Sequence, residues 1–540
     1  MDRRDQSLRR RFRPALILLG AAVPLAVLGV FFLVPVSGMV SRGFQPTYDG
    51  TGGGVGGVLS VLGRPRVHRV LWFTLWSSGL AATLTVLLGV PAASVLYRLR
   101  WRGRGVVRAL VLTPFVIPTV VVGIAIRQLL TDGGLLGGLG LDHSAAAIVG
   151  ALVFFNIPVV VRTVGLAWES LDPEPGEAAA LLGAGPFTQF RRITLPALAP
   201  AIAGSAAVTF LFCATAFGIV LMLGGLRYSS VETEIYLLTT NLLDLQGAAA
   251  LSLLQLAVVI VLLGVTSRFQ RPVDAERGPA APRRAARADV PAIAVTALVV
   301  IVIATPLLTL VSGSLQRDGA WTLANYTSLF ETAGPAIRTS LITTAEATAL
   351  AMLLGGWVAA MVSRPSLSPT EARVRRGLDA VFMLPLGVSA VTLGFGFLIT
   401  LGSWRDSPWL VPIAQALVAL PLVVRTLVPV WAGVDDQLRD AAATLGASTR
   451  QILLRIDLPL VRSAFISAAG LAAAVSLGEF GATSFLARDG HPTLPILIYR
   501  LLSHPGAANF GGALAASVVL AALSAAVLVI GERVALPRRR

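Results

Sequence analysis

The sequence predicts an all-α polytopic membrane protein with about twelve transmembrane helices, arranged as two parallel repeats of six. The first observation behind this prediction is composition. The 540 residues are 55% hydrophobic and 13% charged, with a mean hydropathy of +0.77, far above the soluble globular range. The second is a series of long apolar segments, and the third is a repetition of sequence features between the two halves.

The apolar segments are each long enough to cross about 30 Å of hydrocarbon. In the first half they cover residues 14–40, 70–97, 106–130, 145–168, 198–223 and 248–266. In the second half they cover residues 290–311, 337–362, 378–401, 409–431, 463–486 and 512–530. The first segment is too long for the core of a signal peptide, and no small-residue cleavage site follows it. We therefore expect an uncleaved membrane anchor.

The orientation of these segments is predicted from the positions of arginine alone, because the chain contains no lysine. Arginine-rich stretches lie at the amino terminus, at residues 98–108, 268–287 and 364–376, and at the carboxyl terminus. Basic loops stay on the cytoplasmic side of a membrane. Threading twelve helices alternately places all of these stretches, and both termini, in the cytoplasm.

Several kinds of chemistry are excluded. A GxxxxGK[ST] phosphate-binding loop and a Schiff-base enzyme both need a lysine. The formal net charge of +16 does not predict a nucleic-acid partner, because the arginines flank apolar segments. Cys213 has no second cysteine with which to form an intrachain disulfide. The four histidines fall in predicted external loops without metal-ligand spacing, so we expect no metal site and no catalytic site.

The second half of the chain repeats the first. Glu177 and Asp440 lie 263 positions apart, which is 440 minus 177, and the same shift pairs Gly183 with Gly446. An even number of helices separates the copies, so the repeats run parallel about an axis along the membrane normal. A pathway is expected between them.

The repeat predicts the domain organisation. We expect a cytoplasmic amino terminus (1–13), a first repeat (14–267) with a cytoplasmic segment (172–196), a linker (268–289), a second repeat (290–531) with a matching segment (435–459), and a basic cytoplasmic tail (532–540). The linker is rich in Pro, Ala and Arg, a composition typical of a flexible tether.

Each cytoplasmic segment predicts a helix, a glycine turn and a second helix. Asp172 followed by Pro173, and Asp435 in the other copy, are helix-start signals. An alanine-rich helix then runs to Gly183 or Gly446, either of which can end it in the left-handed conformation. A second short helix is expected to stop at a proline before the next span. Single interfacial helices of this kind are common, but two matched copies favour docking to a partner.

These segments resemble the signature of membrane subunits of ATP-binding-cassette importers, which reads EAA, then Gly, then Ile-x-Leu-Pro. Asp440 departs from the usual glutamate of that signature. The residues that the resemblance assigns to ATPase coupling, including one arginine in each copy, are Glu177, Ala178, Ala179, Gly183, Arg192, Leu195, Pro196, Asp440, Ala441, Ala442, Gly446, Arg455, Leu458 and Pro459.

The resemblance implies the fold of a type I importer permease in a bacterial inner membrane. It implies two ATPase subunits on the cytoplasmic side, which use the ATP, and an extracytoplasmic substrate-binding protein. The chain itself is then expected to bind no cofactor and to have no enzymatic activity. In such importers each glycine would fix the elbow angle, and the short helix would fill a cleft of the ATPase.

A fused pair of permease repeats is similar to the ferric-iron and thiamine permease group. Residues 217–236 and 476–499 are similar to thiamine-type permeases in particular. The resemblance therefore implies a small cationic cargo. Thiamine is favoured, and ferric iron or another small solute such as a polyamine is the alternative.

Two carboxylates lie within predicted spans, where ionisable groups are costly and often functional. Glu346 and Glu479 have the apolar or small repeat mates Leu80 and Ala216, so they break the symmetry on one side. Both are candidates to line the substrate pathway. The alternative is that each carboxylate bonds a neighbouring Ser or Thr, or lies near the outer interface.

Two other classes of protein compete with this interpretation. A secondary transporter driven by an ion gradient also uses parallel six-helix halves, but it would need intramembrane ion relays and no paired docking segments. An integral membrane enzyme would need His, Asp or Glu clustered at one depth, which two isolated glutamates do not supply.

Overall fold

The structure is a computed structural model that describes residues 15, 17–46, 53–225, 227–269, 282–317, 319–366, 368–488 and 490–535. The predicted amino-terminal segment 1–13, linker residues 270–281 and tail residues 536–540 lie outside the described residues. Within those ranges the fold is helical, and its one sheet is a short hairpin of β1 (Gln316–Arg317) and β2 (Ala320–Trp321).

The helices group into two compact units. The first unit comprises the described residues within 43–331 and 498–518. Its elements are α4 (Gly54–Leu62), α5 (Pro65–Arg98), α6 (Arg104–Leu112), η2 (Thr113–Phe115), α7 (Thr119–Leu130), η3 (Gly137–Leu139), α8 (Ala145–Glu169), α9 (Glu174–Leu181), α10 (Pro186–Gln189), η4 (Phe190–Thr194), α11 (Leu195–Ala214), α12 (Gly218–Leu223), α13 (Val231–Thr240), α14 (Leu245–Phe269), η5 (Arg287–Asp289) and α15 (Val290–Ser314).

The second unit comprises the described residues within 15–42, 332–497 and 519–535. Its elements are α2 (Ala22–Leu28), η1 (Gly29–Leu33), α3 (Val34–Phe44), α17 (Pro369–Phe382), η6 (Leu384–Gly387), α18 (Ala390–Thr400), η7 (Gly402–Trp404), α19 (Leu410–Ala432), α20 (Asp436–Thr444), α21 (Thr449–Ile452), η8 (Leu453–Asp457), α22 (Leu458–Gly478) and α23 (Thr483–Leu486). Four helices contribute to both units: α3, whose last two residues belong to the first unit, α16 (Ala324–Val362), α24 (Leu494–Ser503) and α25 (Ala507–Ala535).

The units exchange the first helix of each sequence repeat. In the first unit, α15 packs against α5, α6 and α7, although it opens the second repeat. In the second unit, Phe31 of η1 meets Phe397 of α18 edge to face at 6.5 Å, although η1 belongs to the first repeat. Each compact unit is therefore completed by a helix from the other half of the sequence.

Equivalent helices pack alike within each unit, as the repeat predicts. A Cβ added to Gly89 on α5 would lie 2.7 Å from the Cγ1 of Val160 on α8. A Cβ added to Gly355 on α16 would lie 2.7 Å from the Cγ1 of Val423 on α19. Both positions need glycine because the facing helix approaches too closely for a side chain.

Ten helices among the described residues are long and apolar enough to cross a membrane, and a bent pair could supply an eleventh. That pair is the predicted span 106–130, in which α6 and α7 meet at 104°. Pro114 and Pro118 lie at the break, where each removes a backbone donor. The predicted span 378–401 is likewise divided, into α17, η6 and α18, with Pro385 in η6. The third apolar segment of each repeat is therefore a broken helix.

The fifth apolar segment of each repeat is also interrupted. α11 ends at Ala214 and is followed by the short α12, and α22 ends at Gly478 and is followed by the short α23. The predicted spans 198–223 and 463–486 therefore each contain one long helix and one short helix.

Candidate functional site

The first predicted cytoplasmic segment forms an elbow, meaning a helix, a glycine turn and a second helical arm. The Asp172 carboxylate accepts the backbone N–H of Glu174 at 3.0 Å, and α9 begins at Glu174, one residue later than predicted. At the far end Gly183 has φ +83°. Its N–H donates to Ala180 O at 3.0 Å, and the N–H of Ala184 donates to Ala179 O at 2.9 Å. This pair of bonds is a Schellman cap.

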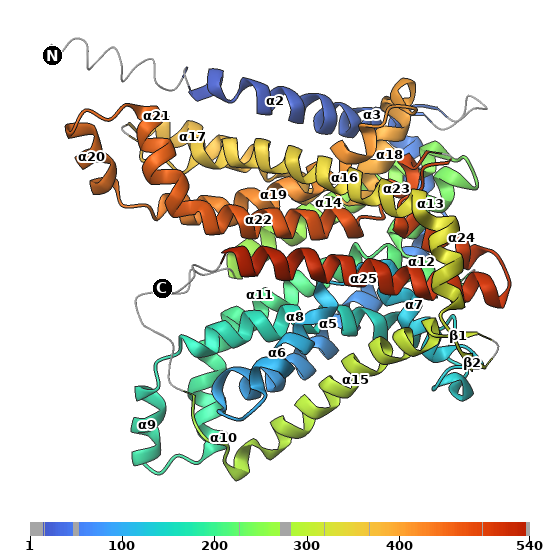
Figure 1. Ribbon diagram of the computed structural model, residues 1–540, viewed down its shortest axis with the longest axis horizontal. Coiled ribbons are helices and arrows are strands. Elements are labelled where there is room, and N and C mark those ends of the chain that lie inside the picture. The colour runs from blue at the N-terminus through green and yellow to red at the C-terminus, as the bar shows by residue number, and fades with distance from the viewer. Residues whose placement is uncertain are drawn as a thin grey trace. The chain divides into compact units, whose positions relative to one another are not determined.

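The second elbow repeats this geometry. Asp435 is the N-cap of α20 and accepts the N–H of Gln437 at 2.9 Å. Gly446 has φ +85°, its N–H donates to Ala443 O, and the N–H of Ala447 donates to Ala442 O, both at 3.0 Å. The predicted left-handed glycine at the end of each helix is confirmed. Figure 1 shows α9 beyond the ends of α8 and α11, and α20 beyond the ends of α19 and α22.

The second arm of each elbow does not stop at the proline as predicted. It runs without interruption into the next span, giving helices Pro186–Ala214 and Arg450–Gly478. One turn of π-helix, η4 or η8, precedes Leu195 or Leu458 in the two copies. The wider turn accommodates the following proline, whose ring would clash with the carbonyl four residues earlier in a regular α-helix. Each arm is therefore a direct extension of a membrane helix.

The residues predicted to couple to an ATPase are mostly exposed. Glu177 and its repeat mate Asp440 are exposed, and so are Arg192 and Arg455 on the arms. Ala178, Gly183, Leu195, Pro196, Ala441, Gly446, Leu458 and Pro459 are exposed as well, whereas Ala179 and Ala442 are half-buried. The structure brings each set together on one elbow.

Large apolar side chains stand at the tip of the first elbow. Leu181, Leu182 and Phe187 are 90%, 89% and 73% exposed. Their repeat mates are Thr444, Leu445 and Arg450, of which Leu445 is 88% exposed. Exposed leucine and phenylalanine side chains that stand close together mark contact surfaces, and the tip of the first elbow is the more apolar of the two.

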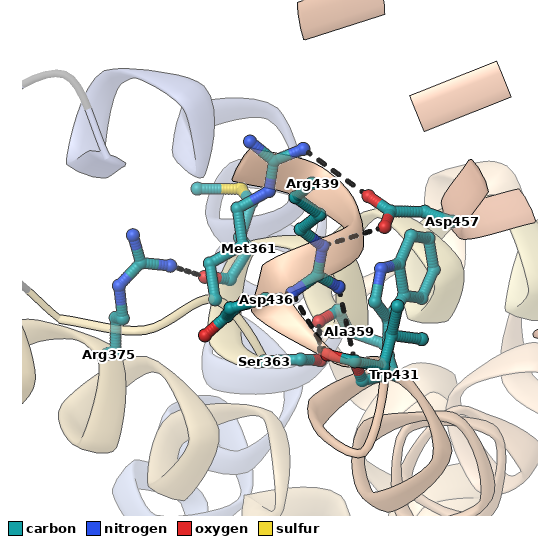
Figure 2. A network of polar contacts seen from close by, with 10 residues as sticks. Ala359, Met361, Ser363, Arg375, Trp431, Asp436, Arg439 and Asp457 are labelled. Atoms are coloured by element: carbon teal, nitrogen blue, oxygen red, sulfur yellow. Dashed lines mark hydrogen bonds and ion pairs between the residues drawn. The ribbon is translucent and has the colours of Figure 1, made fainter. Parts of the chain in front are cut away.

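A buried charge cluster lies at the root of the second elbow (Figure 2). The Asp457 side chain is 1% exposed, and its Oδ1 accepts from Arg439 Nε at 2.8 Å. Arg439 Nη1 donates to Asp436 Oδ1 at 2.6 Å, and Nη2 donates to Trp431 O at 3.4 Å. Arg364 Nη2 approaches Asp457 Oδ2 at 4.0 Å. The cluster borders a cavity of about 1040 Å³, which Asp440 also lines.

Arg439 holds its charge in this cluster. Burial lowers the pKa of Arg439, but its hydrogen bonds to Asp457 and Asp436 and their negative charges raise that pKa, and the net direction is upward. A buried ion pair of this kind fixes geometry more than it adds stability, while loss of one partner leaves a buried charge uncompensated.

Aromatic rings occupy the root of the first elbow. Trp168 on α8 stacks on Phe190 of η4, with ring centroids 6.3 Å apart. The guanidinium of Arg98 lies over the Trp168 ring, 5.4 Å from its centroid. The first elbow cannot form the equivalent of the Arg439–Asp457 ion pair, because Thr194 stands where the second copy has Asp457.

Glu479 has a structural role in its own segment. Its side chain is 6% exposed, and its carboxylate accepts the N–H of Ala482 at 2.7 Å and the N–H and hydroxyl of Thr483 at 3.0 and 2.5 Å. The carboxylate thus stabilises the amino terminus of α23, much as an N-cap does. Bonding to a neighbouring Thr was the alternative to a pathway role.

Glu346 differs from Glu479. It is half-buried on α16, and its side chain makes no hydrogen bond or ion pair with the described residues. Its place in the substrate pathway stays a prediction, as does that of Glu479. No three His, Cys, Asp or Glu side chains gather as a possible metal site in the part of the chain that the structure describes.

Several buried charges escaped prediction from the sequence. Asp457 lies inside the Ile-x-Leu-Pro stretch, but its partner Arg439 is 18 residues away, and nothing local links them. Glu232 and Glu234 are buried on α13, a helix outside the predicted spans. Glu234 pairs with Arg66, with Oε1 and Nε 2.5 Å apart. A search for apolar segments long enough to cross a membrane passes over so short a helix.

Two helical units, each with an elbow continuous with a membrane helix, define the membrane-spanning component of a transport system. The chain belongs to the family of binding-protein-dependent transport system inner membrane components. The model of that family matches residues 85–275 and again residues 351–539, one match in each half. This membership sets aside the gradient-driven alternative.

The similar proteins include several thiamine permeases. The thiamine transport system permease protein ThiP of Brucella abortus (strain 2308) is 29% identical over 493 residues, which is 87% of this chain and 88% of that protein. ThiP of Escherichia coli (strain K12) is 25% identical over 457 residues, 80% and 83% of the two chains. The molybdenum transport system permease protein ModB of Mycobacterium bovis is 36% identical over 214 residues, 38% of this chain and 80% of that protein.

The similar solved structures include a bacterial ABC transporter involved in the import of the acidic polysaccharide alginate. It is 20% identical, with a TM-score of 0.41, and covers 49% of this chain and 100% of that chain.

Proposed function

We propose that this chain is the permease subunit of an importer that carries thiamine, driven through its two elbows by a pair of cytoplasmic ATPase subunits. The observation that carries the proposal is the pair of Schellman-capped elbows, each continuous with a membrane helix. In this arrangement both termini and both elbows lie on the cytoplasmic side, and the coupling residues named in the sequence analysis lie within residues 177–196 and 440–459.

The elbows have the mechanical properties that coupling needs. The left-handed glycine sets a fixed angle between α9 and its arm, and the arm forms one helix with α11. The second elbow joins α20 to α22 in the same way. A displacement of either tip would therefore move a membrane helix directly, and two ATPase subunits closing on ATP would rock the helices around the pathway.

The contact surface on the elbows suits a partner whose cleft is partly apolar and partly acidic. Leu181 and Leu182 present apolar area at the first tip, while the exposed guanidinium groups of Arg192 and Arg455 on the arms make no ion pair with the described residues. Arginine forms strong charge-assisted bonds to carboxylates. We infer that the ATPase offers an apolar pocket rimmed by acidic side chains.

The cargo is inferred from the relatives. Thiamine permeases match most of this chain at 25–29% identity and across more than four fifths of their own length. ModB has the higher identity, but it matches little more than one third of this chain. A binding protein outside the membrane would deliver the cargo, in keeping with the family. Ferric iron remains the alternative cargo.

Uptake by cells tests this function. Deleting the gene should abolish import of labelled thiamine and leave ferric iron and molybdate uptake unchanged, and the wild-type chain should restore it. The double variant Gly183→Ala and Gly446→Ala should fail to restore import, because the left-handed conformation costs about 1–2 kcal/mol at a residue with a Cβ.

The matched control is Gly185→Ala in the same elbow, since Gly185 has an ordinary φ of −65°. Neither Gly183 nor Gly446 has an atom within 4 Å of an added Cβ, so their substitution tests backbone conformation alone. Loss of ferric iron or molybdate uptake in place of thiamine uptake would refute the cargo. Normal import by the double variant would refute the role of the elbows.

A further inference from the structure

The roots of the two elbows differ in chemistry although the sequence repeats. Trp168 and Trp431 are repeat mates, and so are Arg98 and Arg364, which shows that each root keeps a tryptophan and an arginine. The third partner differs. The second root has the buried Asp457, and the equivalent residue of the first root is Thr194.

In the second unit Asp457 provides a bonding partner that holds the elbow helix in place. Arg439 projects from α20 and donates hydrogen bonds to two partners. One is Asp457 at the root of α22, and the other is the carbonyl of Trp431 at the end of α19. α20 is therefore fastened to both membrane helices that flank it. Asp457 Oδ2 has no hydrogen-bond partner in the described residues, and Arg364 Nη2 lies 4.0 Å from it.

In the first unit the elbow helix lacks such a fastening. Gly176 stands at the position equivalent to Arg439. The side chains of α9 make no hydrogen bond or ion pair with the described residues, and none of its residues is buried. The root is held instead by Trp168 and Phe190, which secure the arm and not α9.

We propose that Asp457 and Arg439 are positioning residues that clamp the second elbow helix to its membrane helices, so that movement of α20 reaches α19 and α22 together, whereas movement of α9 reaches the membrane through its arm. This inference rests on the proposed coupling function. The clamp assigns unequal roles to the two elbows: α20 acts on two membrane helices at once, while α9 acts on one through its arm.

Amide hydrogen exchange on the purified full-length chain tests the clamp without any partner. The variants Asp457→Asn and Arg439→Gln should each raise exchange in α20 about tenfold, because local opening is no longer opposed by the ion pair. Exchange in α9 should stay unchanged. Thr194→Asn is the matched control in the first elbow and should leave exchange in both helices unchanged.

A stronger test is to build the same ion pair into the first elbow. Installing the pair in the first elbow, as Gly176→Arg with Thr194→Asp, should slow exchange in α9. The double variant Asp457→Asn with Arg439→Gln removes both charges and should fold even if a single variant does not, because it leaves no buried charge unpaired. Exchange in α20 that is unchanged in this double variant would overturn the clamp.

Transport separates the clamp from the proposed function. With the cognate ATPase, the double variant should retain co-purification and hydrolyse ATP at the wild-type rate, but import about tenfold less thiamine per ATP hydrolysed. Equal import per ATP would overturn the positioning role while leaving the permease function intact. If the wild-type chain binds no ATPase, the proposed function fails, and the exchange experiment still decides whether the clamp exists.

Discussion

Glu479 and Glu346 are both carboxylates within predicted membrane spans, but they have different surroundings in the structure. Glu479 accepts three hydrogen bonds at the start of α23, whereas Glu346 makes none with the described residues. The sequence offered both as pathway candidates because it could not show which of them has donors close by. Local backbone geometry makes that distinction, since the chain turns after Gly478 and brings two N–H groups to the carboxylate.

Replacing these residues by glutamine should separate the two roles. Glu479→Gln should destabilise the protein by about 1–3 kcal/mol, because the amide NH₂ would face buried donors that it cannot satisfy. Glu346→Gln should leave stability unchanged and lower thiamine import. Thermal unfolding in detergent and uptake by cells are the two measurements. Equal melting temperatures for the two variants would contradict the capping role of Glu479.

At the scale of the element, each elbow arm is joined to its membrane helix through a π-turn. η4 and η8 occur at the same place in both repeats, each directly before a Leu-Pro pair. A π-turn adds one residue to a helical turn, so it resets the direction in which the arm faces. The orientation of Arg192 and Arg455 therefore depends on the proline that follows.

Pro196→Ala should allow η4 to relax to a regular α-helix. The arm would then rotate by about 100°, the angle of one residue, and thiamine import should fall although stability does not. Pro200→Ala is the control, because Pro200 lies within α11, beyond the π-turn. Uptake and thermal unfolding of the two variants would be compared. An unchanged uptake with Pro196→Ala would show that the orientation of the arm does not matter.

At the scale of the whole molecule, each compact unit is completed by a helix from the other sequence repeat. α15 packs on α5, α6 and α7, which form part of the opposite half of the sequence. Without α15, the apolar surface that these three helices bury against it would be left uncovered. The duplicated halves are therefore expected to depend on each other for folding.

A divided chain tests this dependence. Fragments 1–269 and 282–540 should co-purify when expressed together, and each should accumulate poorly when expressed alone. Fragment 1–317, which includes α15, should accumulate better alone than fragment 1–269. The measurement is the yield of each tagged fragment in the membrane fraction. High yields of both separate halves would argue against the exchange of first helices.

The sequence by itself determined the membrane class, the duplication and the two glycine-turned elbows. Hydropathy and left-handed glycine are local properties, so they can be read from neighbouring residues; Gly183 and Gly446 took the predicted conformation for this reason. The tertiary structure alone decided the exchange of first helices and the pairing of Asp457 with Arg439. These depend on contacts between residues distant in sequence, and no local pattern of hydrophobicity or turn preference encodes which distant partner a side chain meets.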